Sequence, residues 1–386
     1  MNKIDYVVYI HRLYDSGRPK LGGLDYLIEH LLANGKRVLV VESPLYPRQY
    51  STIVVTYREG TDIQKLYDFD LRFSNDAFVW LVGILIDFYV AARYKTKNAY
   101  VLSSDPLSSF PAIVLRKAGL FRFHYYHCTD YSETRFKNKF LNQLYRWLLS
   151  LSMRNADLVG AVSKRILDQA REYNPKNITY IPNSPDFESY ANYRVAVTDR
   201  NKKMLVLTCA GIIQRYNVLE TIRILAEVLK SISGVKLTII GSTDLDKDYY
   251  SKVLSEIVKL ELQDSVIFTG YVSREANCEI IARSYIGIAL YDPVDSYSKY
   301  ADPLKIREYA ALGIPCVSDL VTSASEEMAE NKAGYAVSDY KDAVVKIVTL
   351  LQDNETYIKF SENALKWAMA LDKQRILKKL IDTYLA

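Results

Sequence analysis

The sequence predicts an α/β protein built from two Rossmann-like domains with parallel sheets. Its 386 residues suit two domains of ordinary size. Strand-like segments alternate with helix-like segments of ten or more residues, which is the pattern of parallel βαβ units. A polar segment at residues 195–203 interrupts the series and reads as a linker, after which the alternation restarts. We therefore place a first domain at residues 1–197 and a second at 198–386, with the last helix a candidate to return to the first domain.

The first series of segments predicts the sheet of the first domain. Residues 37–43 (RVLVVES) form a β-rich run without polar alternation, as expected for a parallel strand buried on both faces. The preceding residues 24–36 carry leucine and isoleucine at helical spacing, and Gly35 marks the end of that helix. The other strands expected in this domain are residues 6–10, 98–104, 121–128, 156–163 and 177–183.

The second series repeats the pattern. A strand at residues 204–211 runs into a glycine turn, and a helix is expected at residues 219–232. The further strands expected here are residues 235–242, 266–271, 286–292 and 314–319, and the chain reads as helical from residue 341 onward. Ligands of open α/β sheets bind beyond the carboxyl ends of the strands, so two such domains are expected to face each other across a cleft.

Composition excludes several classes of protein. The net charge of +5 without a long basic run favours anionic substrates or an anionic membrane surface over nucleic acid. The four cysteines are far apart and form no CxxC, so neither zinc nor a disulfide framework is expected, and the cytoplasm is the expected compartment. The start of the chain lacks the apolar core of a signal peptide. The apolar run at residues 78–94 is short for a bilayer span and contains Asp87, so it predicts a buried helix, with membrane contact as the alternative.

Residues 301–317 (ADPLKIREYAALGIPCV) place charged side chains in a segment that otherwise reads as buried. Pro303 suits the first position of a helix, and Gly313 suits the position just past its end. At helical spacing Glu308 falls on the apolar stripe between Leu304 and Leu312. A buried carboxylate is costly unless it is paired or hydrogen-bonded, so Glu308 needs a partner.

Three segments resemble the GT-B glycosyltransferases of family 4, also called glycosyl transferases group 1. They are GGLDYLIEHLLANGKRVLVVE (22–42), ADLVGAVSKRILDQA with NITYIPNSPDF (156–187), and DPLKIREYAALGIPCV (302–317). The resemblance implies a GT-B fold and transfer of a sugar from a UDP- or GDP-sugar to a glycan, a lipid-linked acceptor or a polysaccharide precursor. It also implies that the first domain binds the acceptor and the second the donor. The resemblance further implies metal-independent stabilisation of the leaving group, so no metal and no cofactor are expected.

The resemblance implies donor-binding roles in the second domain. Glu308 would accept hydrogen bonds from the ribose hydroxyls, and the alternative is a weak pair with Lys305 on the same helix. Gly211 and Arg215 would bind the diphosphate, with Lys305 as a second cation and a solvated Arg215 as the alternative. Tyr300 stands where many retaining members carry another glutamate. Retention or inversion of the sugar configuration therefore stays open.

The first domain offers two further groups of candidates. Gly22 and Gly23 would let phosphate or acceptor approach the backbone, and the alternative is an ordinary strand-to-helix turn. In residues 124–135, at the end of a predicted strand, Asp130 would be the base of an inverting reaction, whereas His127 would hold the sugar or stabilise positive charge in a retaining one. The alternative roles are structural: Asp130 caps the following helix and His127 packs.

Residues 135–155 are amphipathic and basic, with five cations from Arg135 to Arg154. They favour either docking on anionic lipid at the cytoplasmic face of a membrane or packing on the domain itself. Two other functions stay open: a non-catalytic nucleotide-sugar binding protein, and a GT-B-like nucleotide-sugar epimerase. A nicotinamide oxidoreductase is disfavoured because residues 11–23 lack the GxGxxG spacing after the first strand.

Overall fold

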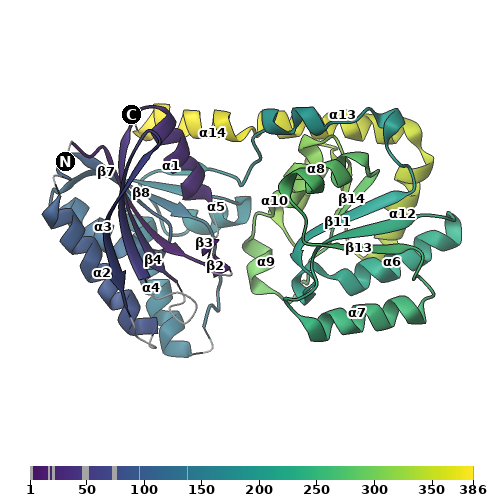
Figure 1. Ribbon diagram of the computed structural model, residues 1–386, viewed down its shortest axis with the longest axis horizontal. Coiled ribbons are helices and arrows are strands. Elements are labelled where there is room, and N and C mark those ends of the chain that lie inside the picture. The colour runs from purple at the N-terminus through teal and green to yellow at the C-terminus, as the bar shows by residue number, and fades with distance from the viewer. Residues whose placement is uncertain are drawn as a thin grey trace. The chain divides into compact units, whose positions relative to one another are not determined.

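The chain divides into two compact units, Met1–Ile181 with Leu377–Ala386, and Pro182–Ile376. Each unit is a Rossmann-like α/β domain with a central sheet (Figure 1), which confirms the predicted fold class. The predicted boundary after residue 197 differs, because residues 182–197 belong to the second unit. The computed structural model describes residues 3–15, 18–19, 22–45, 52–71, 76–94, 96–136 and 138–385.

The first unit has an eight-stranded sheet in the order β10-β9-β8-β7-β1-β4-β5-β6. Strands β10 to β4 are parallel, and β5 and β6 continue the sheet antiparallel at one edge. The strands are β1 (Tyr6–Arg12), β4 (Arg37–Pro44), β5 (Thr52–Glu59), β6 (Asp62–Asp70), β7 (Ala99–Ser103), β8 (Phe121–Cys128), β9 (Leu158–Ala161) and β10 (Ile178–Tyr180). A two-stranded ribbon pairs β2 (Tyr14–Asp15) with β3 (Arg18–Pro19).

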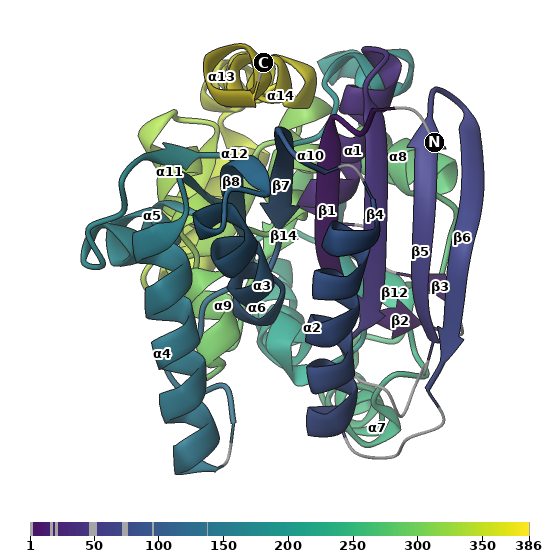
Figure 2. The same cartoon turned by 90° about the vertical axis from the view of Figure 1, so that its left-hand side faces the viewer.

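Helices cover both faces of this sheet. One core joins β1, β4 and β5 to α2 and α3, and its members include Val7, Val41, Ile86 and Ala112. Figure 2 shows α2, α3 and α4 on this side of the sheet. Neighbouring strand residues such as Val8 point the other way and are equally buried, as a parallel strand covered on both faces requires. The helices are α1 (Gly23–Ala33), α2 (Asp76–Arg93), α3 (Pro106–Lys117), α4 (Lys139–Asn155) and α5 (Lys164–Arg171).

The second unit has a six-stranded, wholly parallel sheet in the order β13-β12-β11-β14-β15-β16. Its strands are β11 (Met204–Gly211), β12 (Lys236–Ser242), β13 (Val266–Gly270), β14 (Ile286–Ala289), β15 (Cys316–Asp319) and β16 (Gly334–Val337). One core lies between this sheet and α6, α7 and α12, and a second core lies against α8, α10, α11 and α13. The strand order reverses between β11 and β14, which is where doubly wound sheets bind ligands.

The helices of the second unit are α6 (Val218–Ser231), α7 (Lys247–Lys259), α8 (Arg274–Arg283), α9 (Ser296–Tyr300), α10 (Leu304–Ala311), α11 (Ser323–Glu330), α12 (Tyr340–Gln352) and α13 (Asn354–Ala370). Helix α14 (Lys373–Leu380) crosses the boundary between the units, and a π-helical turn, Ile381–Leu385, ends the description. The Tyr6 hydroxyl donates to the Leu385 carbonyl, which ties the end of the chain to β1. Three short 3₁₀ helices are η1 (Glu188–Tyr193), η2 (Val197–Asp199) and η3 (Gln214–Tyr216).

The segment at residues 195–203 is not a free linker. The Arg200 guanidinium is buried and donates to the Gly313 carbonyl at 2.7 Å, the Tyr357 hydroxyl at 3.0 Å and the Ser361 hydroxyl at 3.1 Å. Arg200, one of the polar residues that suggested a linker, therefore satisfies buried polar groups of the second unit. Composition alone did not distinguish these two uses of a polar side chain.

Candidate active site

The segment that carries Glu308 forms a short helix, α10, at the edge of the second unit's core. Pro303 is the residue before the helix, with an extended ψ of 118°, so the helix begins one residue later than predicted. The preset φ of proline suits this extended cap equally well. Gly313 has a φ of +72°, as predicted for the residue past the helix end.

Glu308 lies partly buried in α10 and meets a partner that the sequence did not reveal. The Tyr190 hydroxyl, from η1, donates to Glu308 Oε1 at 2.7 Å. Burial raises the pKa of the Glu308 carboxyl, while the Tyr190 hydrogen bond and the charges of Arg274 and Lys305 oppose that shift. The second oxygen, Oε2, makes no hydrogen bond with the described residues, so Glu308 retains an acceptor for a ligand.

Lys305 is the most unusual cation of the second unit. Its side chain is buried, and its Nζ has no hydrogen-bond partner in the described part of the chain. The ammonium lies 4.1 Å from the ring centre of Tyr216 and 5.3 Å from that of Tyr291. Burial lowers the pKa of Lys305 to about 8. Aromatic faces offset part of the cost of burying a cation, but they leave its three N–H donors unused.

In the turn after β11, Gly211 packs closely against a neighbouring side chain, whereas Arg215 is partly exposed. A Cβ on Gly211 would lie 2.4 Å from Leu245 Cδ1, so a side chain here would displace Leu245. The Arg215 side chain is 46% exposed and pairs with Asp295 at 2.8 Å. Arg215 is therefore engaged within the loop, and its predicted contact with a diphosphate requires it to share or leave Asp295.

The other buried charges near α10 explain why the segment tolerates them. Arg307 is fully buried, donates to Asp302 and lies 3.5 Å from Glu327. Asp302 also accepts from the backbone N–H of Asn183 at 2.6 Å. An arginine at an otherwise apolar helix position was the signal available in the sequence, because a buried guanidinium must have an acidic partner.

In the first unit, the predicted Gly-Gly loop and His127 lie against each other. Gly22 caps the N-terminus of α1, and its backbone N–H donates to Asp25 Oδ2 at 2.6 Å. A Cβ on Gly23 would lie 2.3 Å from His127 Nε2, so the imidazole occupies the space that a side chain would fill. These candidates come from segments more than a hundred residues apart in the sequence.

The two ring nitrogens of His127 differ in their hydrogen bonding. Its Nδ1 lies 2.7 Å from the Tyr125 hydroxyl, and its Nε2 is buried without a hydrogen-bond partner among the described residues. Burial lowers the pKa of His127 to about 4, so the ring is neutral near pH 7. A neutral ring suits contact with a sugar hydroxyl better than a charge–charge interaction. His124, on the opposite face of β8, instead contacts Ser103.

Asp130 follows β8 and is 45% exposed on its side chain. Its Oδ1 accepts from Arg135 at 2.9 Å. The alternative in which Asp130 caps the following helix is wrong, because Asn138 caps α4 and accepts from the backbone N–H groups of Phe140 and Leu141. Asp130 is thus free of helix capping and close to solvent, with one cation beside it.

A buried ionic network supports the Gly-Gly loop and was missed in the sequence. Arg12, at the end of β1, donates to both carboxylate oxygens of Asp25 at 2.6 and 2.5 Å and to Glu42 at 2.7 Å. Glu42 also accepts from Arg58 at 2.8 Å. These residues fix the first turn of α1, and bidentate arginine contacts are among the more rigid polar contacts in proteins. In the described residues, no cluster of His, Cys, Asp and Glu is arranged to hold a metal ion.

Known families match both halves of the chain. Residues 23–189 match the model described as Glycosyltransferase Family 4, and residues 189–367 match Glycosyl transferases group 1. The two matches together span most of the chain, which therefore belongs to the family 4, group 1 glycosyltransferases of GT-B fold. This confirms the family predicted from the sequence.

One curated relative is the poly(glycerol-phosphate) alpha-glucosyltransferase of Bacillus subtilis (strain 168). It is 23% identical over 292 residues, which are 73% of this chain and 38% of the relative. The chain thus spans well under half the length of that relative.

Solved structures share the fold over nearly the whole length. The sucrose-phosphate synthase of Thermosynechococcus elongatus is 16% identical, with a TM-score of 0.71 and coverage of 98% of each chain. HepE of Anabaena, solved in complex with UDP, is also 16% identical, with a TM-score of 0.70 and the same coverage. A trehalose-6-phosphate protein of E. coli bound to UDP-2-fluoro glucose is 12% identical, with a TM-score of 0.71 and the same coverage.

Proposed function

We propose that this protein transfers a sugar from a nucleoside diphosphate sugar to a glycan acceptor, without a metal ion or another cofactor. The observation that carries the proposal is the position of Lys305 one turn before Glu308 on α10. A buried ammonium with unused donors is suited to a diphosphate, and a carboxylate with an open oxygen is suited to the two ribose hydroxyls. The two groups match adjacent parts of one nucleotide.

The chemistry follows from the charge that develops as the sugar leaves. Departure of the nucleoside diphosphate builds negative charge on the diphosphate oxygens. Lys305 offsets that charge without reorganising water, because it is already desolvated. Arg215 is a second proposed cation for this role, and Gly211 is the proposed backbone contact, where the phosphates would have to displace the Leu245 side chain.

In the first unit, Gly22, Gly23 and His127 form the proposed acceptor side. The unpartnered His127 Nε2 is neutral at pH 7 and is able to accept a hydrogen bond from a sugar hydroxyl. Asp130 is the proposed base for an inverting reaction, and in a retaining reaction it would be dispensable.

The comparisons favour some substrates over others. HepE binds UDP and the E. coli protein binds UDP-2-fluoro glucose, which favours a UDP-sugar over a GDP-sugar. The Bacillus relative is named for glucosyl transfer to poly(glycerol-phosphate), which supports an acceptor of the cell-envelope polymer class. A lipid-linked acceptor and a peripheral contact with an anionic membrane at its cytoplasmic face belong to the same proposal.

A thermal-shift comparison of UDP, GDP, ADP and NAD tests the donor. A ligand that binds only the folded state raises the melting temperature by an amount set by its concentration and Kd. We expect a shift with UDP that is lost in Lys305→Met and kept in Lys252→Met, an exposed lysine on α7. A shift with NAD alone would overturn the proposal. Release of an epimerised nucleotide-sugar in the absence of any acceptor would show that the protein is an epimerase and not a transferase.

A further inference from the structure

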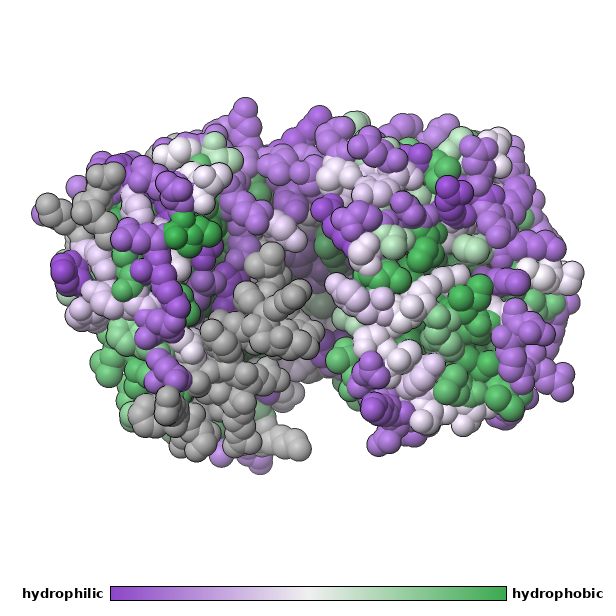
Figure 3. Space-filling model, in the orientation of Figure 1, coloured by the Kyte–Doolittle hydropathy of each residue, from purple (hydrophilic) through white to green (hydrophobic). Residues whose placement is uncertain are grey.

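Helix α2 buries one side and exposes an apolar stripe on the other. Val79, Ile86 and Val90 contribute to the core of the first unit. At intervals of three and four residues, the outer side carries Phe78, Leu81, Leu85 and Tyr89, of which Leu81 is 53% and Leu85 58% exposed. The prediction of a helix here is confirmed, and the prediction of burial holds for one side only. Figure 3 shows apolar surface on the first unit in the lower left, where Figure 1 places α2.

Helix α4 also exposes large apolar side chains, and these lie among cations. Phe140 is 68% and Trp147 54% exposed. Lys139, Arg146 and Arg154 are exposed on the same helix, and residues 139–155 contain no acidic residue. Lys137, another cation of residues 135–155, lies outside the described residues. Apolar side chains interleaved with cations are characteristic of helices that lie on anionic lipid.

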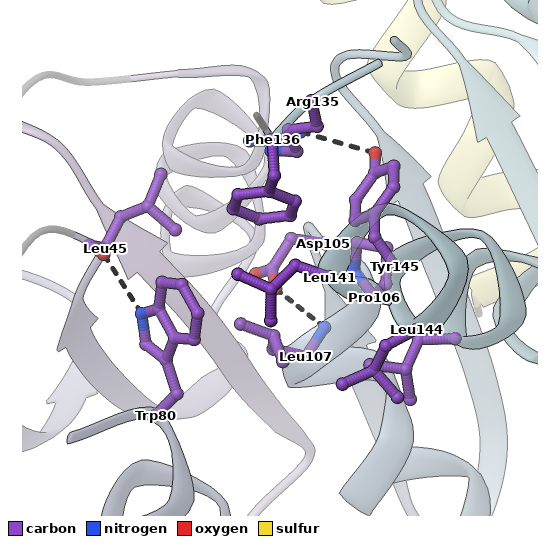
Figure 4. Close-up of a pocket in the computed structure, with 11 residues that line it drawn as sticks. Leu45, Trp80, Asp105, Pro106, Leu107, Arg135, Phe136, Leu141, Leu144 and Tyr145 are labelled. Atoms are coloured by element: carbon purple, nitrogen blue, oxygen red, sulfur yellow. Dashed lines mark hydrogen bonds between the residues drawn. The ribbon is translucent and has the colours of Figure 1, made fainter. Parts of the chain in front are cut away.

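A pocket of about 80 Å³ opens beside the first halves of α2 and α4 (Figure 4). Trp80 of α2 and Leu141, Leu144 and Tyr145 of α4 line it, together with Phe136. The polar groups of the wall are already engaged. The Trp80 ring N–H donates to the Leu45 carbonyl at 3.0 Å, Arg135 pairs with Asp130, and Asp105 pairs with His11. The free surface of the pocket is thus hydrocarbon.

The pocket and the exposed apolar face of α4 form one continuous apolar region. Leu144 lines the pocket and is also 41% exposed, so it joins the interior of the pocket to the outer face of α4. A single hydrocarbon chain, leaving a surface on which α2 and α4 rest, would reach the pocket without crossing a polar barrier. No helix in the described ranges is both long and apolar enough to cross a bilayer.

We propose that the outer faces of α2 and α4 dock on an anionic lipid bilayer, and that the pocket between them takes the hydrocarbon chain of a lipid from that bilayer. This inference rests on the proposed function and narrows it, because a lipid in the pocket favours a lipid-linked acceptor over the other acceptor classes. A bilayer supplies both hydrocarbon for the apolar stripe and negative headgroups for Lys139, Arg146 and Arg154. A second copy of the chain would bring the same three cations to the interface, where like charges oppose each other.

Sedimentation with vesicles tests the docking face. The protein is mixed with vesicles of phosphatidylglycerol and phosphatidylcholine, or of phosphatidylcholine alone. We expect binding to the anionic vesicles that weakens about tenfold or more for each exposed anchor removed in Leu81→Gln and Phe140→Gln. Val258→Gln is the matched control, because Val258 is 60% exposed on α7 of the second unit. Equal binding by all four proteins, or no binding by wild type, would overturn the docking face.

Tryptophan fluorescence tests the pocket. Trp80 lines the pocket, and lipids with brominated acyl chains quench tryptophans that their chains contact. We expect quenching that is reduced in Trp80→Phe, and that is also reduced in Leu141→Phe, which fills the pocket while leaving the exposed anchors in place. Vesicle binding with the same quenching in wild type and Trp80→Phe would show a docking face without a chain in the pocket, and would overturn that part of the proposal.

Two further readouts separate this inference from its rivals. A wild-type dimer in sedimentation equilibrium that becomes a monomer in Leu81→Gln would show that a second copy covers α2, and would overturn the lipid proposal. The thermal shift with UDP reports the donor site in the second unit and should not change in Leu81→Gln or Phe140→Gln. If the wild-type protein shows the UDP shift but does not bind vesicles, the lipid proposal alone is overturned. If it binds vesicles but shows no UDP shift, the proposed donor alone is overturned.

Discussion

Asn183 and Asp302 are joined by two hydrogen bonds across 119 residues of sequence. The Asn183 backbone N–H donates to Asp302 Oδ2 at 2.6 Å, and its side-chain amide donates to the Asp302 carbonyl at 3.0 Å. Asp302 also accepts from the fully buried Arg307. The Ile-Pro-Asn segment, noted in the sequence only as a family feature, thus anchors the start of the segment that carries Lys305 and Glu308.

Asp302→Asn is expected to destabilise the second unit strongly. Removing one partner of a buried ion pair costs about 3–5 kcal/mol, and here it would leave the buried Arg307 without its closest carboxylate and with the longer contact to Glu327. Urea unfolding measures the loss. The double variant Asp302→Asn with Arg307→Met should recover part of it, because the unpaired charge is then absent. A double variant that is less stable than the two single changes added together would contradict this account.

Gly23→Ala should destabilise the first unit, because the new Cβ would meet His127 Nε2 at 2.3 Å. Overpacking of this kind costs about 1–3 kcal/mol. Gly22→Ala is the matched control, since a Cβ there has nothing within 4 Å. Thermal unfolding of both variants, and of Gly23→Ala combined with His127→Ala, tests the contact. Equal effects of the two single changes would show that the imidazole is not what excludes a side chain at residue 23.

Glu308→Ala should weaken UDP binding by about tenfold or more, because a hydrogen bond to a charged group contributes about 1.5–3 kcal/mol. Isothermal titration measures the change in Kd. Glu279→Ala, at an exposed position on α8, provides the control. Unchanged affinity in a folded Glu308→Ala protein would leave the carboxylate as a structural partner of Tyr190 alone.

The affinity for UDP should fall as the pH rises above about 8, where Lys305 loses its proton. In the unfolded chain the same lysine keeps its proton to about pH 10.4. Between these values the unfolded state binds more protons, so the free energy of unfolding should rise with pH while the affinity falls. In Lys305→Met both trends should disappear. Titration of the nucleotide itself affects both proteins equally, so the difference between their pH profiles reports Lys305. A pH profile of the Kd that is the same in wild type and Lys305→Met would exclude Lys305 as the diphosphate cation.

Asp130→Asn decides between the two mechanisms left open in the first unit. If Asp130 is the base of an inverting transfer, turnover should fall by about 10²-fold or more, with UDP affinity unchanged. If turnover stays within a factor of two, Asp130 is not the base. The anomeric configuration of the product, read by NMR, gives an independent answer.

The sequence predicted those elements whose apolar residues follow a clear period. Helices α1 and α6 and the parallel strands of both sheets are at the expected places, except β16 (Gly334–Val337), which was not predicted. β5 was overlooked although Ile53, Val55 and Tyr57 alternate toward the core. β6 offers little signal, because it is an edge strand exposed along most of its length. The Gly60 turn that joins them has a positive φ, which was a readable hairpin signal.

The site was predictable where one segment carries a motif, and not where distant residues meet. Glu308 and Lys305 could be named from a single helix. Tyr190, which bonds Glu308, and Asn183, which anchors Asp302, lie outside that motif. The contact of His127 with Gly23 depends on how β8 lies beside the start of α1, which neither segment encodes by itself. Pairings of this kind are set by the tertiary fold.

The segment at residues 182–200 also determines how the two halves of this enzyme could be recombined with those of its relatives. It supplies Asn183, Tyr190 and Arg200 to the second unit, and each bonds residues between Asp302 and Ser361. A chimera joined after residue 197 would graft a foreign Tyr190 position beside Glu308. Junctions at 181/182 and 376/377 would transplant the whole second unit with these contacts intact, so they are the simplest places at which to exchange it.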